Sequence, residues 1–354
     1  MTTLEAPNLS IKQKSAPGPK LLVIRNDKLG DFMLAWPALA LLRRNLPQAH
    51  IAVLVPAYTA PLAELCPSVD QVVMDPKLPG EWRNGRALAR LIKPEGFDAV
   101  IALFSRFDTG LGVRLAGIPR RYAPATKLAQ FFYDRRLPQR RSRSEKPEYE
   151  YNLDLVRAYL AELGISQPTP VAAPYLGFPP AEVKKLKQAF LKQHKISAGR
   201  QLVFVHAGHG GSASNLSLGQ YGHLIRDLSA PRKRHFVLTA GPGEEHQAKR
   251  LASLVEGPNT VWASKSGLVD FAKHLAFADL FISGSTGPLH LAAALDRPTA
   301  AFYPRRRSST ALRWQTVNGD DKRLAFMPAA EAEESDMTSI DVTQAAAAIA
   351  KKLL

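Results

Sequence analysis

DLFISGSTGPLHLAAALDRPTAAFYP, residues 279–304, joins an apolar strand to a helix through a turn of small residues. Glycines in this turn let the backbone approach a ligand closely, and Pro288 suits the first turn of a helix. The amino end of the helix presents free N–H groups and a partial positive charge, which favour a phosphate. Ser285 and Thr286 add hydroxyl donors. A well-capped strand–turn–helix without any ligand shares this pattern, so both interpretations stay open on this stretch alone.

Outward from this stretch, short apolar runs alternate with helical segments along the whole chain. In the first half the apolar runs are residues 21–25, 50–56, 71–75 and 97–103, and in the second half they are 201–208, 234–241, 260–264, 279–285 and 298–304. Strands spaced by helices predict parallel sheets. The fold class is therefore α/β, with two doubly wound Rossmann-like domains. Ligands in such sheets bind beyond the carboxyl ends of the strands, so the cleft between the domains is the expected site.

The chain's 354 residues suit two domains. A segment with five prolines, residues 165–180, is the best candidate for a linker. We expect four parts: a disordered leader at 1–19, an N-terminal domain at 20–172, a C-terminal domain at 173–340, and a last helix at 341–354 that packs back on the N-terminal domain. Residues 137–149 read as an exposed loop. Pro37 predicts a kink or a late start in the first long helix.

The net charge of +16 and pI of about 10.0 indicate an anionic partner, namely nucleic acid, a membrane surface or a phosphorylated substrate. Six of the twelve residues 135–146 are basic, and Arg305, Arg306, Arg307 and Arg313 form a second cluster. Each cluster could also be a plain solvated face. No apolar run reaches the roughly 18 residues of a membrane span, and no signal peptide is evident, so we expect a cytoplasmic protein. The single cysteine, Cys66, excludes a disulfide within the chain and is expected in the core.

Two further motifs are weaker. Gly208, Gly210 and Ala213 match the dinucleotide pattern G-x-G-x-x-A, but the next strand lacks the acidic residue that would hold a ribose, which disfavours a nicotinamide cofactor. A loop that holds a phosphate remains open. His206, His209 and His290 lack metal-ligand spacing, so no metal is expected. Asp31 follows Gly30 at the start of a helix, where it could be a cap or a general base at the mouth of the cleft.

Four segments together resemble the lipopolysaccharide heptosyltransferases, glycosyltransferase family 9, from about Lys20 to Leu354. They are LLVIRNDKLGDFMLAWPAL at 21–39, RLAGIPRRYA at 114–123, VHAGHGGSASNLSLGQYGHLI at 205–225, and FISGSTGPLHLAAALDRPTAAFYP at 281–304. The resemblance implies a GT-B fold and an inverting, metal-independent transfer of a sugar, typically from ADP-heptose, to the lipopolysaccharide inner core. No cofactor is implied.

The resemblance also assigns roles to residues. Asp31 matches the family's carboxylate, which is proposed to take the proton of the acceptor hydroxyl. The donor diphosphate would lie at the start of the helix that contains Pro288. The donor-binding residues implied are His206, Gly208, Gly211, Ser212, Asn215, Ser285, Thr286, Gly287, Pro288, His290 and Arg305. The acceptor-binding residues implied are Arg25, Lys28, Gly30, Arg120 and Arg121.

The sequence departs from the family pattern at three places. Ser285 stands where many members have an Asp that contacts the donor sugar, and Leu216-Ser217 replaces a usual Trp-Pro. Ser214 or Asn215 lies near the position of a basic residue that faces the donor phosphates. We expect Arg305 or Arg306 to supply that charge instead.

Three hypotheses follow. The first is a glycosyltransferase with a nucleotide-sugar donor and an anionic glycolipid acceptor, bound peripherally to the anionic surface of the inner membrane. The second, a nucleic-acid-binding protein, is disfavoured because no recognition helix or aromatic-interleaved basic strand is evident. The third is a non-catalytic or epimerase-like protein of the same fold that binds a nucleotide sugar.

Overall fold

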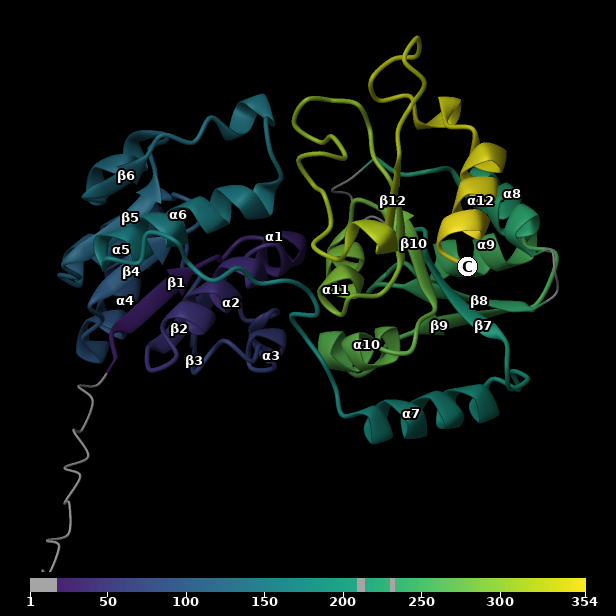
Figure 1. The fold of residues 1–354 in the computed structure, drawn as a ribbon, viewed down its shortest axis with the longest axis horizontal. Helices are drawn as coiled ribbons and strands as arrows, with labels where there is room; N and C mark the ends of the chain where they lie inside the picture. Colours follow the sequence, from purple (N-terminus) through teal and green to yellow (C-terminus); the bar gives the residue numbers. More distant parts are fainter. Residues whose placement is uncertain (1–17, 209–213, 230–232) are drawn as a thin grey trace, which may run out of the picture.

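Two parallel sheets with helices on both faces make up the computed structural model, which describes residues 18–208, 214–229 and 233–354 (Figure 1). The strand order is β3-β2-β1-β4-β5-β6 in the first sheet and β12-β11-β10-β7-β8-β9 in the second. Every strand pairs in parallel with its neighbours. The predicted pair of doubly wound α/β domains is confirmed.

The first domain, as the term is used below, holds the first sheet and helices α1 to α6. Its elements are β1 (Lys20–Ile24), α1 (Leu29–Met33), α2 (Trp36–Asn45), β2 (His50–Val55), α3 (Ala60–Ala63), β3 (Gln71–Met74), α4 (Glu81–Ile92), the 3-10 helix η1 (Lys93–Glu95), β4 (Ala99–Ala102), α5 (Phe107–Leu115), β5 (Arg120–Pro124), η2 (Leu128–Phe132), β6 (Arg135–Leu137), η3 (Arg141–Arg143) and α6 (Glu148–Glu162). Residues 164–179 then run without helix or strand to the second domain.

The second domain holds the second sheet and helices α7 to α12. Its elements are α7 (Pro180–Gln193), β7 (Gln201–His206), α8 (Leu218–Leu228), β8 (Arg234–Ala240), α9 (Glu245–Leu254), β9 (Asn259–Ala263), α10 (Gly267–Leu275), β10 (Leu280–Gly284), α11 (Gly287–Ala294), β11 (Thr299–Phe302), η4 (Asp320–Lys322), β12 (Arg323–Phe326), η5 (Met337–Ser339) and α12 (Val342–Lys352).

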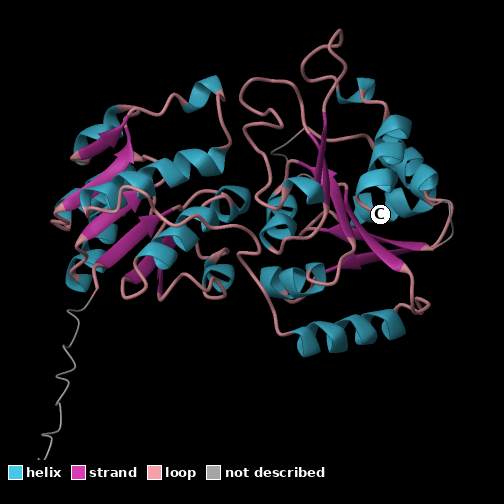
Figure 2. Ribbon diagram, in the orientation of Figure 1, coloured by secondary structure: helices cyan, strands magenta, loops and turns pink. Residues whose placement is uncertain are grey.

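Strand alternation explains how each sheet is covered by helices (Figure 2). Side chains of successive strand residues point to opposite faces. In β1, Leu21 and Val23 belong to the core beneath α2 and α6, whereas Leu22 and Ile24 belong to the core beneath α4 and α5. Both faces are buried, which is why the strands read as continuous apolar runs. The core beneath α2 continues into the second domain through α11, so the domains share packed apolar side chains.

Several expectations about local structure need correction. α12 packs on α8 of the second domain, with Ile349 in that domain's core, so the last helix does not return to the first domain as expected. Residues 137–149 are not simply an exposed loop, because Gln139, Ser144 and Glu148 are buried. Three short strands, β5, β6 and β12, were not predicted from the sequence, because each has only three to five residues and lacks a continuous buried apolar run. The break predicted near Pro37 is confirmed: α2 starts at Trp36, after α1 has ended.

Candidate active site

The carboxyl ends of both sheets open onto one cleft of about 1460 Å³. Its walls in the first domain are the segments after β1, β2 and β4, Arg141 of η3 and the start of α6. Its walls in the second domain are the loops that follow β7 to β11. Strand order reverses between β1 and β4 and between β7 and β10. Open α/β sheets bind ligands at such reversal points, so the cleft is the candidate active site.

Arg25, the first residue after β1, organises the first-domain wall. Its side chain is buried, and its nitrogens reach three carboxylates: Nε to Asp27 at 2.9 Å, Nη2 to Asp31 at 2.5 Å, and Nη1 to Glu148 at 3.4 Å. Nη1 also donates to Asn152 at 3.4 Å. Burial opposes the charge of Arg25, but the three carboxylates outweigh it and raise the pKa above its ordinary value. Arg25 is therefore a fixed cation that orients Asp31.

Asp31 lies in α1 and lines the cleft. Burial is the largest influence and raises its pKa to about 6; Arg25 opposes this shift, while Asp27 and Glu148 add to it. One oxygen, Oδ1, accepts the bond from Arg25, and no described residue donates a hydrogen bond to Oδ2. At pH 7 a carboxyl group with this pKa is about nine-tenths ionised. Asp31 thus combines a free oxygen with a pKa suited to taking up a proton.

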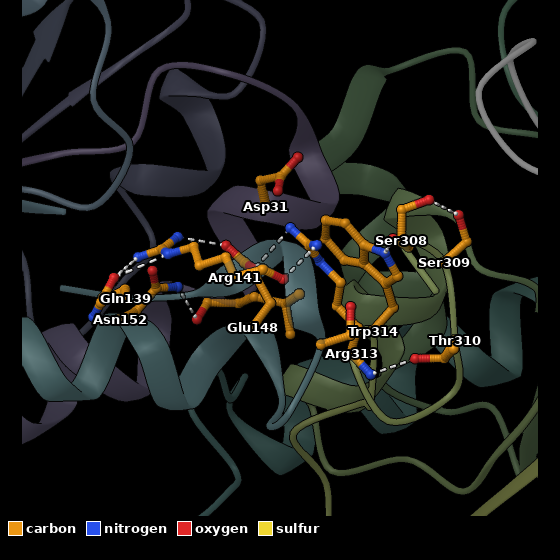
Figure 3. Close-up of polar contacts among 12 residues, drawn as sticks. Asp31, Gln139, Arg141, Glu148, Asn152, Ser308, Ser309, Thr310, Arg313 and Trp314 are labelled. Atoms are coloured by element: carbon orange, nitrogen blue, oxygen red, sulfur yellow. Dashed lines mark hydrogen bonds and ion pairs between the residues drawn. The ribbon is translucent and has the colours of Figure 1, made fainter. Parts of the chain in front are cut away.

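Glu148, at the start of α6, links the first domain to the second (Figure 3). Arg141 of the first domain approaches its Oε1 at 2.6 Å, and Arg313 of the second domain approaches its Oε2 at 3.5 Å. Arg313 also donates to the carbonyl of Arg141 at 2.9 Å, and its own carbonyl accepts the backbone N–H of Glu148 at 2.8 Å. Burial lowers the pKa of Arg141 to about 10, so it stays cationic at neutral pH. One buried carboxylate therefore serves three arginines from both domains.

The turn between β10 and α11 forms the opposite wall. Ser285, Thr286, Gly287, Pro288 and His290 all line the cleft. Thr286 is the residue that precedes the helix, and its hydroxyl makes no capping bond. The first N–H groups of α11 therefore remain available to an anion.

His290 is a buried neutral group in this wall. Burial lowers its pKa to about 4, so the imidazole is uncharged at pH 7. Its Nδ1 has no hydrogen-bond partner among the described residues. A buried polar atom without a partner is costly.

Two glycines allow the walls to meet. Gly30 in α1 faces α11, and a Cβ there would lie 3.1 Å from Cδ2 of His290. A Cβ on Gly287 would lie 2.9 Å from Cδ2 of Leu29. The two helices are seen facing one another in Figure 1. Gly30 and Gly287 thus set the distance between Asp31 and the turn that joins β10 to α11.

In the described part of the loop after β7, two of the predicted donor-binding residues do not line the cleft. His206 lines the cleft, with Nδ1 3.0 Å from the Thr239 hydroxyl and Nε2 3.6 Å from Glu244. Gly208 is buried against the Glu244 carboxylate instead. Asn215 braces the loop: its amide donates to the carbonyl of Ala207 at 2.9 Å, and its oxygen accepts from the backbone N–H of Leu216 and from the Tyr221 hydroxyl. Neither Gly208 nor Asn215 lines the cleft, and Gly211 and Ser212 lie outside the described residues.

Three expected arginines also lie elsewhere. Arg305 donates to the carbonyls of Ala330 and Ala332 and so holds its own domain's loop, whereas the neighbouring Arg306 lines the cleft. Arg120 and Arg121 begin β5, at the amino end of the sheet and therefore opposite the cleft. Arg121 is occupied by the carbonyls of Ile118 and Phe132. These positions do not fit contact with an acceptor in the cleft.

The sequence reading missed several cleft residues. They are Asp27, Phe104, Arg141, Glu148, Glu244, Arg313 and Trp314. Arg141 and Arg313 belong to the two basic clusters, so the charge signal was present. The sequence did not reveal that Arg141 and Arg313, which are 172 positions apart, meet across the two domains. In the part of the chain that the structure describes, no helix is long and apolar enough to cross a membrane, and no group of three or more potential metal ligands occurs.

Comparisons with known proteins agree with this geometry. Residues 85–336 match the model of glycosyltransferase family 9 (heptosyltransferase). A Haemophilus influenzae protein named "Putative glycosyltransferase" is 48% identical over 91% of this chain and 94% of its own. Lipopolysaccharide heptosyltransferase 2 of Escherichia coli is 24% identical over 80% of this chain and 82% of its own.

Solved structures share the fold at low sequence identity. A family 9 glycosyltransferase from Veillonella parvula superposes with a TM-score of 0.79 at 17% identity, covering 95% of this chain and 97% of the other. The Escherichia coli ADP-heptose lipopolysaccharide heptosyltransferase II gives a TM-score of 0.74 at 20% identity, covering 94% and 98%. With both sheets, the cleft and the family match in agreement, the chain belongs to glycosyltransferase family 9, the heptosyltransferase family, and is a glycosyltransferase.

Proposed function

We propose that this glycosyltransferase moves a heptose from ADP-heptose to the lipopolysaccharide inner core with inversion, and that Asp31 is its general base. In this reaction Oδ2 of Asp31 takes the proton from an acceptor hydroxyl. The hydroxyl oxygen then forms a bond to the anomeric carbon, and the bond from that carbon to the donor phosphate breaks, so that the nucleoside diphosphate leaves. The observation that carries the proposal is the placement of Asp31, with its pKa of about 6, against the anion-binding turn of the other domain.

The second domain supplies what a departing diphosphate needs. The N–H groups at the start of α11 and the hydroxyls of Ser285 and Thr286 line the cleft as donors. Arg306 lines the same cleft and is exposed, as is Lys28 on the opposite wall. Stabilising the leaving group is the larger electrostatic task in such a transfer. We assign the diphosphate to this end of the cleft, with Arg306 rather than Arg305 as the one of the two expected arginines that supplies the positive charge. No step requires a metal ion.

The donor and acceptor identities rest on relatives. The similar proteins named as lipopolysaccharide heptosyltransferases, and the structure named for ADP-heptose, support a heptose donor and a core glycan acceptor. The acceptor of such enzymes is anionic, and the exposed Lys28 of the first-domain wall fits that charge. Arg25, first expected to contact the acceptor, is buried and already engaged by three carboxylates. Ser285, which stands where many family members have an acidic residue, is the position at which donor choice should be examined first.

The test is Asp31→Asn, which keeps the shape of the side chain and removes the base. We expect transfer from ADP-heptose to core glycolipid to fall by about 10²–10⁴-fold, while calorimetry shows donor affinity unchanged. Wild-type transfer by the variant would remove Asp31 from its role. A protein that binds the donor but transfers nothing in its wild-type form would instead be a non-catalytic relative. DNA titrated at moderate salt should show no binding.

A further inference from the structure

Apolar side chains stand exposed on the first domain at the carboxyl end of its sheet. Leu128 and Phe131, on η2, are 78% and 70% exposed, and Trp82, in the first turn of α4, is 58% exposed. A soluble surface leaves single apolar residues exposed without consequence, but a contiguous group marks an interaction site. The question is therefore whether these side chains form one surface.

Aromatic contacts join them. The ring of Trp82 meets that of Phe107 at 5.2 Å, and Phe107 meets Phe132 at 5.1 Å. Phe132 lies in η2 together with Leu128 and Phe131. We call these five residues the apolar rim. Its three segments follow β3, β4 and β5, so the rim lies at the same edge of the sheet as the cleft.

Cations flank the apolar rim. Arg136 lies 5.6 Å from the ring of Phe131, Lys127 immediately precedes η2, and Arg83 follows Trp82. All three are exposed, and none has an ion pair among the described residues. The aspartates nearby, Asp108 and Asp134, are each engaged by arginines. Glu81 is the exposed acid beside Trp82. Apolar side chains ringed by unpaired cations are complementary to an anionic lipid surface.

The apolar rim is connected to the acceptor side of the cleft. Nζ of Lys127 lies 5.8 Å from the ring of Phe104, and the guanidinium of Arg25 lies 5.8 Å from the same ring. Phe104 lines the cleft, and Arg25 holds Asp31. Phe104 alone would therefore separate a membrane surface docked on η2 from Arg25, the residue that holds Asp31.

We propose that the apolar rim inserts into an anionic phospholipid surface and thereby presents a membrane-embedded acceptor to the cleft past Phe104. Leu128 and Phe131 enter the interfacial layer, and Lys127 and Arg136 contact lipid phosphates. The binding half of this proposal stands on the exposed residues alone. The delivery half rests on the proposed function.

The first experiment measures cosedimentation of the full chain with two kinds of vesicle, phosphatidylcholine alone or with an equal part of phosphatidylglycerol. We expect binding to the anionic vesicles that weakens with salt. Leu128→Ser together with Phe131→Ser should reduce partitioning about tenfold or more. Lys127→Gln together with Arg136→Gln should reduce it about fivefold per charge, and only on anionic vesicles. Leu254→Ser is the matched control, since Leu254 is 51% exposed on α9 of the other domain.

Trp82 offers a spectroscopic readout of the same event. Its emission should shift to the blue on anionic vesicles, and Trp82→Phe should abolish that shift. The proposal is overturned if wild-type protein stays in the supernatant at low salt, or if the Leu128/Phe131 double variant binds as wild type. It is also overturned if the wild type is a dimer that the double variant converts to monomer, because a second copy would then cover the apolar rim.

The second experiment separates delivery from chemistry. Transfer is measured to a water-soluble core glycan without acyl chains and to the same glycan on lipid in anionic vesicles. The double variant should match wild type on the soluble acceptor and lose about tenfold on the vesicle-bound one. Equal losses on both acceptors would refute delivery. Wild-type protein that transfers to neither acceptor would refute the proposed function, and the vesicle-binding result would still stand or fall by itself.

Discussion

Glu148→Gln tests whether the shared carboxylate sets the pKa of Asp31, the proposed general base. Glu148 is one of the groups that raise the pKa of Asp31, and both carboxylates contact the same guanidinium, that of Arg25. Glutamine keeps the size of the side chain and an oxygen that can still accept from Arg141. The substitution therefore removes a charge and keeps the contacts of Arg25 and Arg141 with Oε1, whereas the amide NH2 in place of Oε2 loses the contact with Arg313.

The size of the effect follows from the geometry. Two carboxylates on the two terminal nitrogens of one guanidinium have charge centres about 6–7 Å apart, and at an effective dielectric constant of about 20 they repel by about 2.5 kcal/mol, or nearly two pKa units. Part of this is lost because Asp31 is partly exposed and because other groups adjust. We expect the pKa of Asp31 to fall by about one unit, from about 6 to near 5.

The direction of the pKa shift of Asp31 can be read from the pH dependence of kcat/KM. A base with a lower pKa stays ionised to lower pH, so the acid limb of kcat/KM should bend about one unit lower in Glu148→Gln than in wild type. Asp27→Asn should move the limb in the same direction, since Asp27 also raises the pKa of Asp31. Glu162→Gln is the control that should not move it, because Glu162 pairs with Arg135 away from the cleft. Thermal unfolding of each variant checks that the fold survives.

An acid limb of Glu148→Gln that stays at the wild-type position, or moves to higher pH, in a folded protein would show that Glu148 does not raise the pKa of Asp31. A purely structural role for Glu148 would lower kcat/KM at every pH without moving the bend. A shift in Asp27→Asn without one in Glu148→Gln would show that the link to the second domain through Arg313 has no electrostatic influence on the base.

Two further predictions concern the meeting of the domains and the donor charge. Gly287→Ala places a methyl group 2.9 Å from Leu29, so it should lower the free energy of unfolding in denaturant by about 1–3 kcal/mol and reduce transfer. Gly30→Ala should have smaller effects on both. Wild-type stability in Gly287→Ala would contradict the tight contact. Arg306→Gln should raise the donor Kd about tenfold in calorimetry. Arg305→Gln should leave the Kd within about twofold of wild type, because the Arg305 side chain holds a loop. A larger increase in Kd for Arg305→Gln than for Arg306→Gln would assign the donor charge to Arg305 instead.

The sequence was most informative where a function depends on backbone in one short segment. The turn at Ser285, Thr286 and Gly287 could be identified because a strand, small residues, a proline and a helix follow one another directly, and this local order alone exposes the N–H groups of α11. Asp31 could be located for the same reason, since it follows Gly30 within a helix of five residues. Such patterns need no knowledge of the rest of the chain.

Long side chains were harder to place, because their direction depends on distant partners. Arg305 and Arg306 are neighbours, yet one turns to the carbonyls of Ala330 and Ala332 while the other faces the cleft. Asn215 was expected at the donor, but the hydroxyl of Tyr221 and nearby backbone groups take up its amide. Arg120 and Arg121 were placed by resemblance, and only the direction of β5 shows that they begin the strand and so lie away from the cleft.

The basic cluster at residues 135–146 shows why contacts between distant residues, which the sequence does not reveal, matter for the site. A run of basic residues with a single acid reads as a solvated face, and residues 135–146, with six basic residues and only Glu145 as an acid, invited that interpretation. Arg141 is instead buried against Glu148, which Arg313 reaches from the other domain. Because Glu148 also contacts Arg25, and Arg25 holds Asp31, the contact between the domains bears on the proposed base itself. A rearrangement that withdrew Arg313 would leave the charge of Glu148 to Arg25 and Arg141, so the electrostatics of Asp31 depend on how the two domains meet.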